Sequence, residues 1–228
     1  MKSRPDAGPI VLAPRRDADI RERTTTMNRF AISLLLPVFA AMPLHAADAG
    51  ESVYTDLVLA ACKTLVAPDP DEPGGDFMSA RCPGLGDYAV IFKEGDLRQS
   101  LHYGYIKPSL VEHAFESFGQ FNHMNPKIEW RVDAGGRPYA AIQRFFVGDA
   151  ENQGQVLAIS RVGQPDDAEG CLVGFVDALA NKDANMLARE VADSVAPSFR
   201  CGEDSAEYHG ARGPKAGDPM IFRGEDAR

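Results

Sequence analysis

Cationic side chains recur in segments whose alternating polarity predicts β-strands. They are Arg98, His102, Arg131, Arg144 and Arg161. An arginine rarely points unpaired into a core, so we expect the arginines on a sheet face that helices leave uncovered, or at sheet edges. Because a strand repeats every two residues, Arg131 shares its face with Glu129 and Asp133, and cross-strand ion pairs would neutralise part of this charge.

Two interpretations of these cations are open. In the first, they form a solvated sheet face. In the second, Arg98, His102, Arg144 and Arg161 converge into a cationic patch on an acidic protein. Such a patch would bind a small anionic ligand or the acidic edge of a partner protein, because guanidinium groups form strong charge-assisted hydrogen bonds to anions.

Residues of the types that serve in catalysis or metal binding show no catalytic or metal-binding pattern in the sequence. The sequence has no GxSxG, P-loop or HExxH motif, and it predicts no catalytic residue, no metal and no cofactor. The acidic loop after Asp69 lacks the carboxylate that an EF-hand requires at its twelfth position. Asp177 ends a predicted strand and is expected to accept backbone N–H groups in the turn, with a catalytic acid as the alternative.

The four cysteines are an even number in a chain that we expect to be exported, which favours two disulfides. They are Cys62, Cys82, Cys171 and Cys201. A strand over 170–178 followed by an antiparallel helix of similar length over 183–195 returns the chain to its starting end. This geometry pairs Cys171 with Cys201, and the Cys62–Cys82 pair follows by elimination.

The 228-residue chain is acidic, with 24 Lys and Arg residues against 33 Asp and Glu residues. The net charge of −9 argues against a nucleic-acid partner, because such proteins present a basic surface. The composition, 44% hydrophobic and 25% charged, is typical of a globular domain rather than a disordered or fibrous chain.

Residues 27–46 show the order of regions typical of a secretory signal peptide. A short basic start precedes an apolar run from Phe30 to Leu44, and Ala46 suits a signal peptidase. The run is shorter than a membrane-spanning helix and contains two prolines, so no stable membrane span is expected. The sequence therefore predicts a periplasmic protein, with residues 1–26 as an upstream extension that is not part of the native gene product.

Removal of residues 1–46 makes the expected mature chain still more acidic. That segment holds 7 of the 24 basic and 4 of the 33 acidic residues, which leaves a net charge of −12. We expect a single domain over 47–201, followed by a disordered acidic tail over 202–228 that is rich in Gly, Pro and charge.

Hydrophobic periodicity predicts an α+β domain. Strands are expected from Val53 onward and over 88–93, 97–105, 127–133, 139–147, 155–162 and 170–178. Helices are expected from Ser109 to about Asn122 and over 183–195, and residues 66–80 are expected to form a loop. Together these elements predict a mostly antiparallel sheet of about six or seven strands, with two helices packed on it.

Several short stretches resemble a group of uncharacterised small exported proteins from alpha-proteobacteria. They are Tyr54–Leu57, Cys82–Gly84, Gly95–Arg98, Lys127–Arg131, Gly154–Leu157 and Val176–Asn181. The likeness covers roughly 53–201 and implies a signal peptide and a two-disulfide domain. It implies no activity.

The lack of a catalytic signature favours an exported, soluble, non-catalytic binding or interaction module of the periplasm. An alternative is an inhibitor of a hydrolase such as lysozyme. Small periplasmic lysozyme inhibitors are disulfide-bonded, β-rich proteins, and some insert a Gly-x-x-Tyr loop, a spacing found at Gly136–Tyr139. A further alternative is a hydrolase whose site is assembled from residues distant in sequence.

Overall fold

The computed structural model describes residues 50–69, 71 and 75–224. The predicted signal peptide and the upstream extension lie outside these residues. The strands are β1 (Glu51–Asp56), β2 (Lys63–Val66), β3 (Met78–Leu85), β4 (Tyr88–Gly95), β5 (Arg98–Gly104), β6 (Phe115–Phe118), β7 (Asn122–Val132), β8 (Pro138–Val147), β9 (Gly154–Arg161), β10 (Cys171–Asp177), β11 (Glu207–Tyr208) and β12 (Pro219–Phe222). The helices are α1 (Pro108–His113) and α2 (Ala184–Ser194), with 3-10 turns η1 (Leu59–Ala61) and η2 (Ala196–Ser198).

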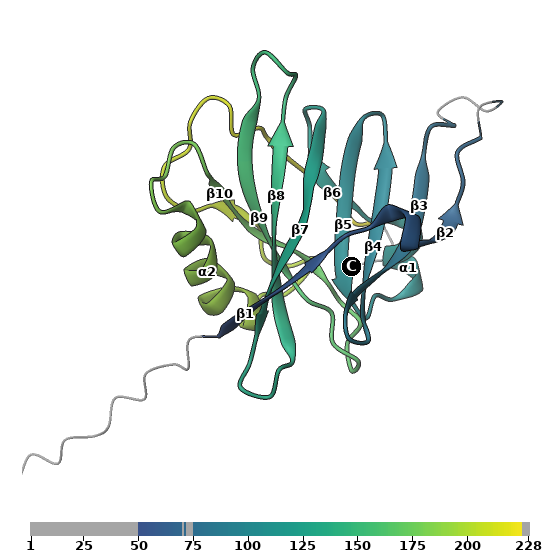
Figure 1. Cartoon of the computed structure of the whole chain (residues 1–228), viewed down its shortest axis with the longest axis horizontal. Coiled ribbons are helices and arrows are strands. Elements are labelled where there is room, and N and C mark those ends of the chain that lie inside the picture. The colour runs from purple at the N-terminus through teal and green to yellow at the C-terminus, as the bar shows by residue number, and fades with distance from the viewer. Residues whose placement is uncertain (1–49, 70, 72–74, 225–228) are drawn as a thin grey trace, which may run out of the picture. The chain divides into compact units, whose positions relative to one another are not determined.

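Within the described residues the strands form three sheets rather than the single sheet expected (Figure 1). The six-stranded sheet has the order β1-β7-β8-β9-β10-β11 and is antiparallel except for its β10–β11 pair. The four-stranded sheet has the order β2-β3-β4-β5, and β12 pairs with β6 in a separate two-stranded sheet. The α+β class, the two helices and the two disulfides are confirmed, whereas the prediction of one sheet is wrong.

The main core joins the six-stranded and four-stranded sheets. Side chains from both enter one buried cluster, in which the rings of Tyr103 and Trp130 meet edge to face with centroids 5.5 Å apart. Trp130 is fully buried, and its indole N–H donates to Thr55 Oγ1, so the only polar atom of its ring is satisfied. These contacts hold β5, β7 and β1 together across the two sheets.

Helix α2 packs on the opposite face of the six-stranded sheet (Figure 1). Its buried stripe is short and alanine-rich, with Ala184, Ala188, Val191 and Ala192 facing β8, β9 and β10. Small side chains let the helix approach the sheet closely, and this spacing is the 3.6-residue period that the sequence shows. The predicted helix over 183–195 is therefore confirmed.

The strands predicted over 88–93 and 97–105 are present and pair as a hairpin, although the turn between them lies slightly later than the predicted gap at 94–96. Gly95 pairs with Arg98, so Asp96 and Leu97 form the two-residue turn. Both have positive φ, at 49° and 56°, as a turn matched to the right-handed twist of the strands requires. The predicted loop over 66–80 is strand at both of its ends, because β2 includes Val66 and β3 begins at Met78.

The first predicted helix is much shorter than expected. It ends at His113, because Ala114 has extended backbone angles and the chain continues as β6. The Lys93 ammonium group donates to the carbonyls of Leu110 and Ala114, which satisfies acceptors that a continuing helix would have used. The prediction of a helix to Asn122 is wrong because pairing with β12, about a hundred residues later, decides the conformation of this segment.

Residues 202–224 are ordered, so the prediction of a disordered tail is wrong over this range; residues 225–228 lie outside the described residues. The segment packs against the core through Tyr208, whose ring lies 5.3 Å from that of Phe175. Asp177 and Asn181 bind its backbone at Gly213 and Ala211. Contacts to distant residues therefore order a segment whose composition is typical of disorder.

The predicted disulfide pairing is confirmed. Cys62 bonds to Cys82, and Cys171 bonds to Cys201. The second bond joins the start of β10 to the turn after η2, as the matched lengths of the strand and helix predict. Such bonds are typical of proteins that fold in an oxidising compartment. Among the described residues, no helix is both long enough and apolar enough to cross a bilayer.

Candidate functional site

The structure does not gather Arg98, His102, Arg144 and Arg161 into one patch. Arg98 bonds to Asp96 and to the Gly119 carbonyl at the end of β5. Arg144 donates to Gln155 and Asn185, and Arg161 binds the Glu169 carbonyl and Asp167. Each arginine therefore has its own partners in a different part of the domain.

The expectation that the arginines lie on a sheet face without a helix is wrong for the six-stranded sheet. Arg131 faces α2 and is 5% exposed, because Asp193 of the helix accepts its Nε and Nη2, each at 2.8 Å. Glu129 on the same face accepts from Arg189 of α2. Side chains of β7 and α2 thus form ion pairs at the margin of the apolar stripe of α2. Strand periodicity alone does not reveal this pairing.

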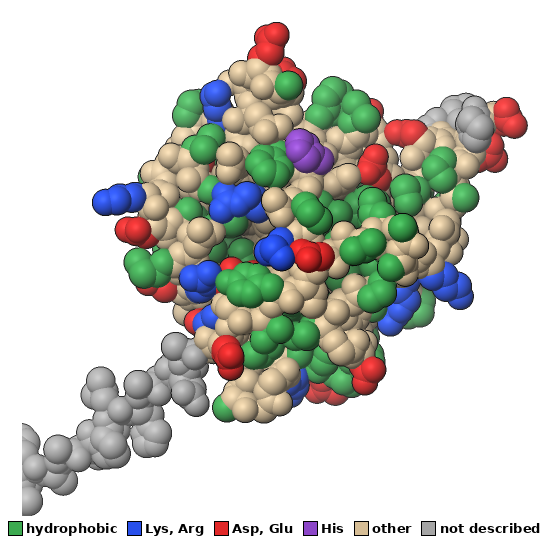
Figure 2. All heavy atoms as spheres, in the orientation of Figure 1, with side chains coloured by type: hydrophobic (Ala, Val, Ile, Leu, Met, Phe, Trp, Pro, Cys, Tyr) green, Lys and Arg blue, Asp and Glu red, His purple; other side chains and the backbone are tan. Residues whose placement is uncertain are grey.

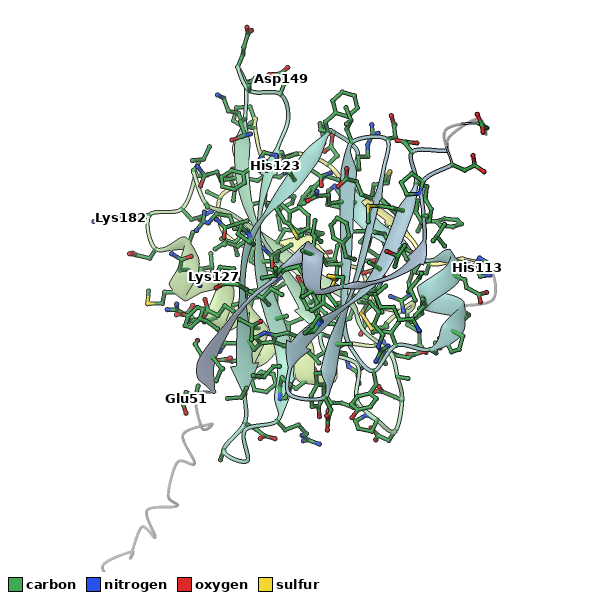
Figure 3. The ribbon with its side chains drawn as sticks, turned by 45° about the vertical axis from the view of Figure 1, so that its right-hand side comes forward. Glu51, His113, His123, Lys127, Asp149 and Lys182 are labelled. Atoms are coloured by element: carbon green, nitrogen blue, oxygen red, sulfur yellow. A yellow bond between two sulfur atoms is a disulfide. The ribbon has the colours of Figure 1, made fainter. Side chains whose placement is uncertain are left out.

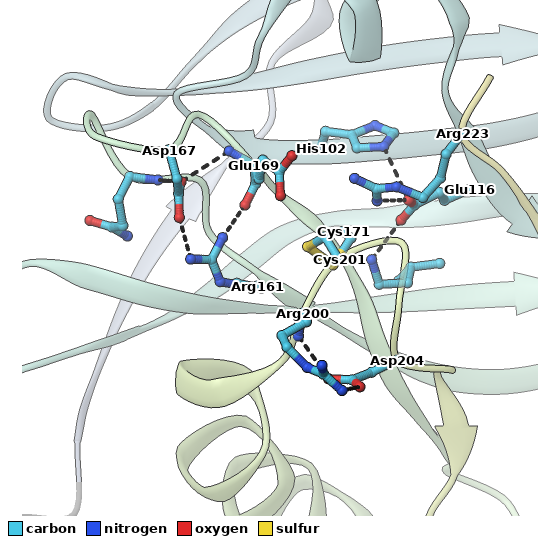
Figure 4. Close-up of a disulfide and its surroundings, with 12 residues drawn as sticks. His102, Glu116, Arg161, Asp167, Glu169, Cys171, Arg200, Cys201, Asp204 and Arg223 are labelled. Atoms are coloured by element: carbon cyan, nitrogen blue, oxygen red, sulfur yellow. Dashed lines mark hydrogen bonds and ion pairs between the residues drawn. A yellow bond between two sulfur atoms is a disulfide. The ribbon is translucent and has the colours of Figure 1, made fainter. Parts of the chain in front are cut away.

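His102 has a different environment from the arginines, because it is 1% exposed and lies between the four-stranded sheet and β6 (Figure 4). Its Nε2 lies 3.7 Å from Glu116 Oε1, on β6. Glu116 also accepts the Leu172 N–H at 2.6 Å and binds Arg223 just after β12. With Lys93 of β4, these side chains form a buried group that we call the ionic cluster: Lys93, His102, Glu116 and Arg223.

Electrostatics within the ionic cluster keep Glu116 ionised. Burial alone would raise the pKa of its carboxyl, but His102, the Arg223 guanidinium and the Leu172 amide outweigh burial and hold that pKa below its ordinary value. Burial lowers the pKa of Lys93 to about 8, although the Glu116 carboxylate opposes this shift. At neutral pH the cluster thus contains two buried cations and one buried anion, with His102 close to the anion.

The ionic cluster is incompletely paired. Both ring nitrogens of His102, and Nε and Nη2 of Arg223, are buried and have no hydrogen-bond partner among the described residues. A neutral imidazole carries one N–H donor and one acceptor, so His102 has one of each without a partner. The two Arg223 nitrogens are further N–H donors without an acceptor. Buried polar groups in native proteins are nearly always satisfied, so these four nitrogens are the hydrogen-bonding capacity that the side chains of the cluster leave unused.

An open cleft of about 480 Å³ borders the ionic cluster. Its wall includes Glu116 and Arg223, together with the Cys171 end of the second disulfide, and we call it the disulfide cleft (Figure 4). Apolar side chains that line it are Leu172, Phe199, Ala206, Ile221 and Phe222. Glu203 and Asp204 lie at its rim, where both bind the exposed guanidinium of Arg200.

The carboxylate of the ionic cluster and the nearby Ser100 hydroxyl are both engaged in hydrogen bonds. Ser100 is fully buried, and its hydroxyl accepts the Glu116 N–H at 2.9 Å. Both carboxylate oxygens of Glu116 accept hydrogen bonds, so neither serves as a free base. Glu116 and Arg223 thus place one charged side chain of each sign in the wall of the disulfide cleft.

Two other residues singled out in the sequence have structural roles. Asp177 is buried and accepts the N–H groups of Leu179, Ala180 and Gly213, as expected for a turn residue. Tyr139 does not project from the β7–β8 turn, because its hydroxyl donates to Asp193 at 2.6 Å beside α2. The Gly-x-x-Tyr spacing therefore does not form an inserting loop here.

The remaining histidines are not brought together. His113 lies on α1 and His123 on β7, at separate places on the molecule (Figure 3). Within the described part of the chain, no group of three or more His, Cys, Asp or Glu side chains is arranged to hold a metal ion.

Sequence reasoning found His102 but missed Lys93, Glu116 and Arg223. Lys93 offered a signal, because it continues a run of buried strand residues, Ala89 to Phe92, on a strand that is buried on both faces. Glu116 was assigned to a helix, and Arg223 to a disordered tail. Comparison with known proteins adds no assignment: no family model, no curated protein and no solved structure matches this chain.

Proposed function

We propose that the chain is an exported, non-catalytic binding protein whose disulfide cleft takes a small ligand with a carboxylate head and an apolar body. The observation that carries this proposal is the Arg223 side chain. It lines the cleft and is 10% exposed; its Nη1 binds Glu116, while Nε and Nη2 lie buried in the cleft wall without an acceptor among the described residues, so a ligand reaches them only when this side chain shifts toward the cleft. A carboxylate oxygen is the acceptor that a guanidinium group pairs with best.

The charges and surfaces around Arg223 support the same ligand class. Within the ionic cluster Lys93 and Arg223 face one carboxylate, Glu116, and the other two carboxylates of the cleft wall, Glu203 and Asp204, are paired with Arg200. Leu172, Phe199 and Phe222 provide apolar surface for the body of the ligand. Concave sites that combine apolar surface with a few convergent polar groups are typical of small-molecule binding.

Export is the second half of the proposal. It is supported by the signal-peptide pattern over 27–46 and by the two disulfides. The resemblance to small exported proteins of alpha-proteobacteria is consistent with it. Amino-terminal sequencing of the protein recovered from a periplasmic fraction tests this half, with a mature start within two residues of Ala47 expected and a start near Met27 contradicting it.

Titration calorimetry with octanoate tests the ligand class. We expect octanoate to bind, and octylammonium, which has the same tail and the opposite charge, to bind at least tenfold more weakly. Arg223→Gln should weaken octanoate binding about tenfold or more. Arg212→Gln is the matched control, because Arg212 is an exposed arginine bound to Asp218 outside the cleft. Equal octanoate binding by both variants, or no binding at millimolar concentration, overturns the proposal.

A further inference from the structure

A second surface, on strands β2 and β3 of the four-stranded sheet, carries an unbalanced charge. Lys63 of β2 lies directly opposite Arg81 of β3 in the antiparallel register, and both are exposed. Neither forms an ion pair or a side-chain hydrogen bond with any described residue. Every other arginine between residues 75 and 224 donates at least one hydrogen bond to a protein oxygen.

Two like charges directly opposite each other on neighbouring strands destabilise the pair. The chain has an excess of acidic residues, yet none neutralises this pair among the described residues. The pair borders a shallow hollow of about 280 Å³, in which Asp87 is the one carboxylate among the lining residues. An anion placed between Lys63 and Arg81 would convert the repulsion into two charge-assisted contacts.

The same place is the free edge of a sheet. Strand β2 pairs with β3 on one side, and within the described residues no strand covers its other side. All four of its residues are exposed, including Leu65 at 41% and Val66 at 46%. An edge of this kind presents unpaired backbone N–H and C=O groups to any chain that can lie alongside it.

Apolar surface continues from this edge onto the segment that precedes it. Val58 and Leu59, at the start of η1, are 55% and 45% exposed. The Cys62–Cys82 disulfide fixes this segment against β3. Figure 2 shows hydrophobic side chains gathered over η1 and the neighbouring strands. Cations, free backbone groups and exposed apolar side chains therefore occur together.

We propose that the β2 edge is a docking surface for an extended, acidic segment of another protein, which adds to the four-stranded sheet as a fifth strand. Backbone hydrogen bonds supply the pairing, as in other cases of strand addition. The register of β2 against β3 shifts between Thr64 and Val66, yet Lys63 and Leu65 are both exposed along the edge, so an added strand that places a carboxylate beside Lys63 places a later side chain of the same face beside Leu65. The segment that fits is one in which acidic and apolar residues share a face.

Fluorescence anisotropy with a labelled eight-residue peptide of sequence Glu-Thr-Val-Thr-Glu-Thr-Val-Thr, which places glutamate and valine on one face of the strand, tests this proposal. We expect saturable binding to the purified protein, and at least tenfold weaker binding when lysine replaces glutamate in the peptide. The double variant Lys63→Glu, Arg81→Glu should also weaken binding at least tenfold. Lys182→Glu is the control, because Lys182 is an exposed lysine on the loop before α2 (Figure 3) and should change affinity less than twofold.

A second peptide separates strand addition from simple attraction of charge. N-methylation of alternate amides removes backbone donors and leaves the charge unchanged, so it should weaken binding at least tenfold. Equal binding of the methylated peptide overturns strand addition, and an equal effect of Lys182→Glu overturns the site. Concentration-dependent dimerisation that the double variant abolishes would identify a second copy of the chain as the occupant, which also overturns the proposal. Octanoate binding is read separately, since it involves neither Lys63 nor Arg81.

Discussion

Charged side chains lie against both large sheets, but the two sheets accommodate them in opposite ways. On the six-stranded sheet, charges lie at the margin of α2, around an apolar stripe. On the four-stranded sheet they lie beneath α1 and β6, where Lys93, His102 and Glu116 are 1–2% exposed. Water reaches the first set in part and is excluded from the second.

The two sets also differ in how completely they are paired. Beside α2, Arg131 donates to Asp193, Ser52 and the Gly50 carbonyl, so each guanidinium nitrogen has a partner. In the ionic cluster, two nitrogens of Arg223 and both of His102 have none among the described residues. A satisfied network rigidifies a fold, whereas a partly satisfied buried network costs stability and is retained where it serves another purpose. The incomplete pairing therefore makes the disulfide cleft, rather than the surface beside α2, the candidate functional site.

The largest expected difference between the two sets comes from removing an acid. Glu116→Ala leaves Arg223 and Lys93 buried without a counter-charge, and we expect it to cost about 3–5 kcal/mol of unfolding free energy. Glu129→Ala, on the α2 side, removes a partner of the half-exposed Arg189 and should cost about 1 kcal/mol. Urea denaturation of both variants measures the difference, and equal costs would show that burial does not distinguish the two sets.

Stability at alkaline pH tests the buried cation. The folded-state pKa of Lys93 is about 8, below the ordinary value of 10.5, so above pH 8 the unfolded state holds the proton that the folded state has lost. Stability should therefore rise from pH 8 toward 10, by at most about 3 kcal/mol. Lys93→Met should remove the rise, and Lys127→Met, at an exposed ion pair, should keep it. A flat profile in the unaltered protein contradicts the expectation.

On the α2 side, a more moderate effect is expected from Asp193→Asn. The change keeps the shape of the side chain but removes the charge that faces the buried Arg131 and accepts the Tyr139 hydroxyl. We expect a loss of about 2 kcal/mol, measured by thermal denaturation. Asp204→Asn, which affects the exposed pair with Arg200, should lower the midpoint of thermal denaturation much less than Asp193→Asn does. If Asp204→Asn costs as much, surface pairs carry more stability than we assign.

The smallest effect is expected at Arg98. Its ion pair with Asp96 lies in the β4–β5 turn, where the Asp96 side chain is 80% exposed. Arg98→Ala should change the unfolding free energy by less than about 1 kcal/mol and leave octanoate binding unchanged. Weaker octanoate binding by this variant would revive the idea that Arg98 belongs to a common cationic site.

Local patterns predicted the parts of the fold that local geometry determines. The β4–β5 hairpin, α2 and the disulfide pairing follow from strand periodicity, helix periodicity and matched element lengths. The failures share a cause, since β6 and β12 form because they pair with each other across about a hundred residues. Periodicity within 109–122 also fits a helix, and nothing local distinguishes the two outcomes.

The candidate site was the least predictable part, because its members come from four separate elements. His102 was recognised as a cation, but its partner Glu116 lies on the strand mistaken for helix, and Arg223 follows β12. An ion pair between residues that are distant in sequence leaves no recognisable pattern in a single sequence. Arg131 shows the same limit, since its partner Asp193 lies on a helix whose placement over the sheet had to be known first.

The pairing of Glu116 with Arg223 spans 107 residues of the chain, and this separation affects the order of folding. Closing so long a loop has a high entropic cost, which is recovered only after the two large sheets have brought β6 and β12 near each other. The carboxylate therefore loses its water late, when β12 docks. The earlier strands can form their hairpins while Glu116 is still hydrated, and the docking of β12 that completes the fold also closes the wall of the disulfide cleft.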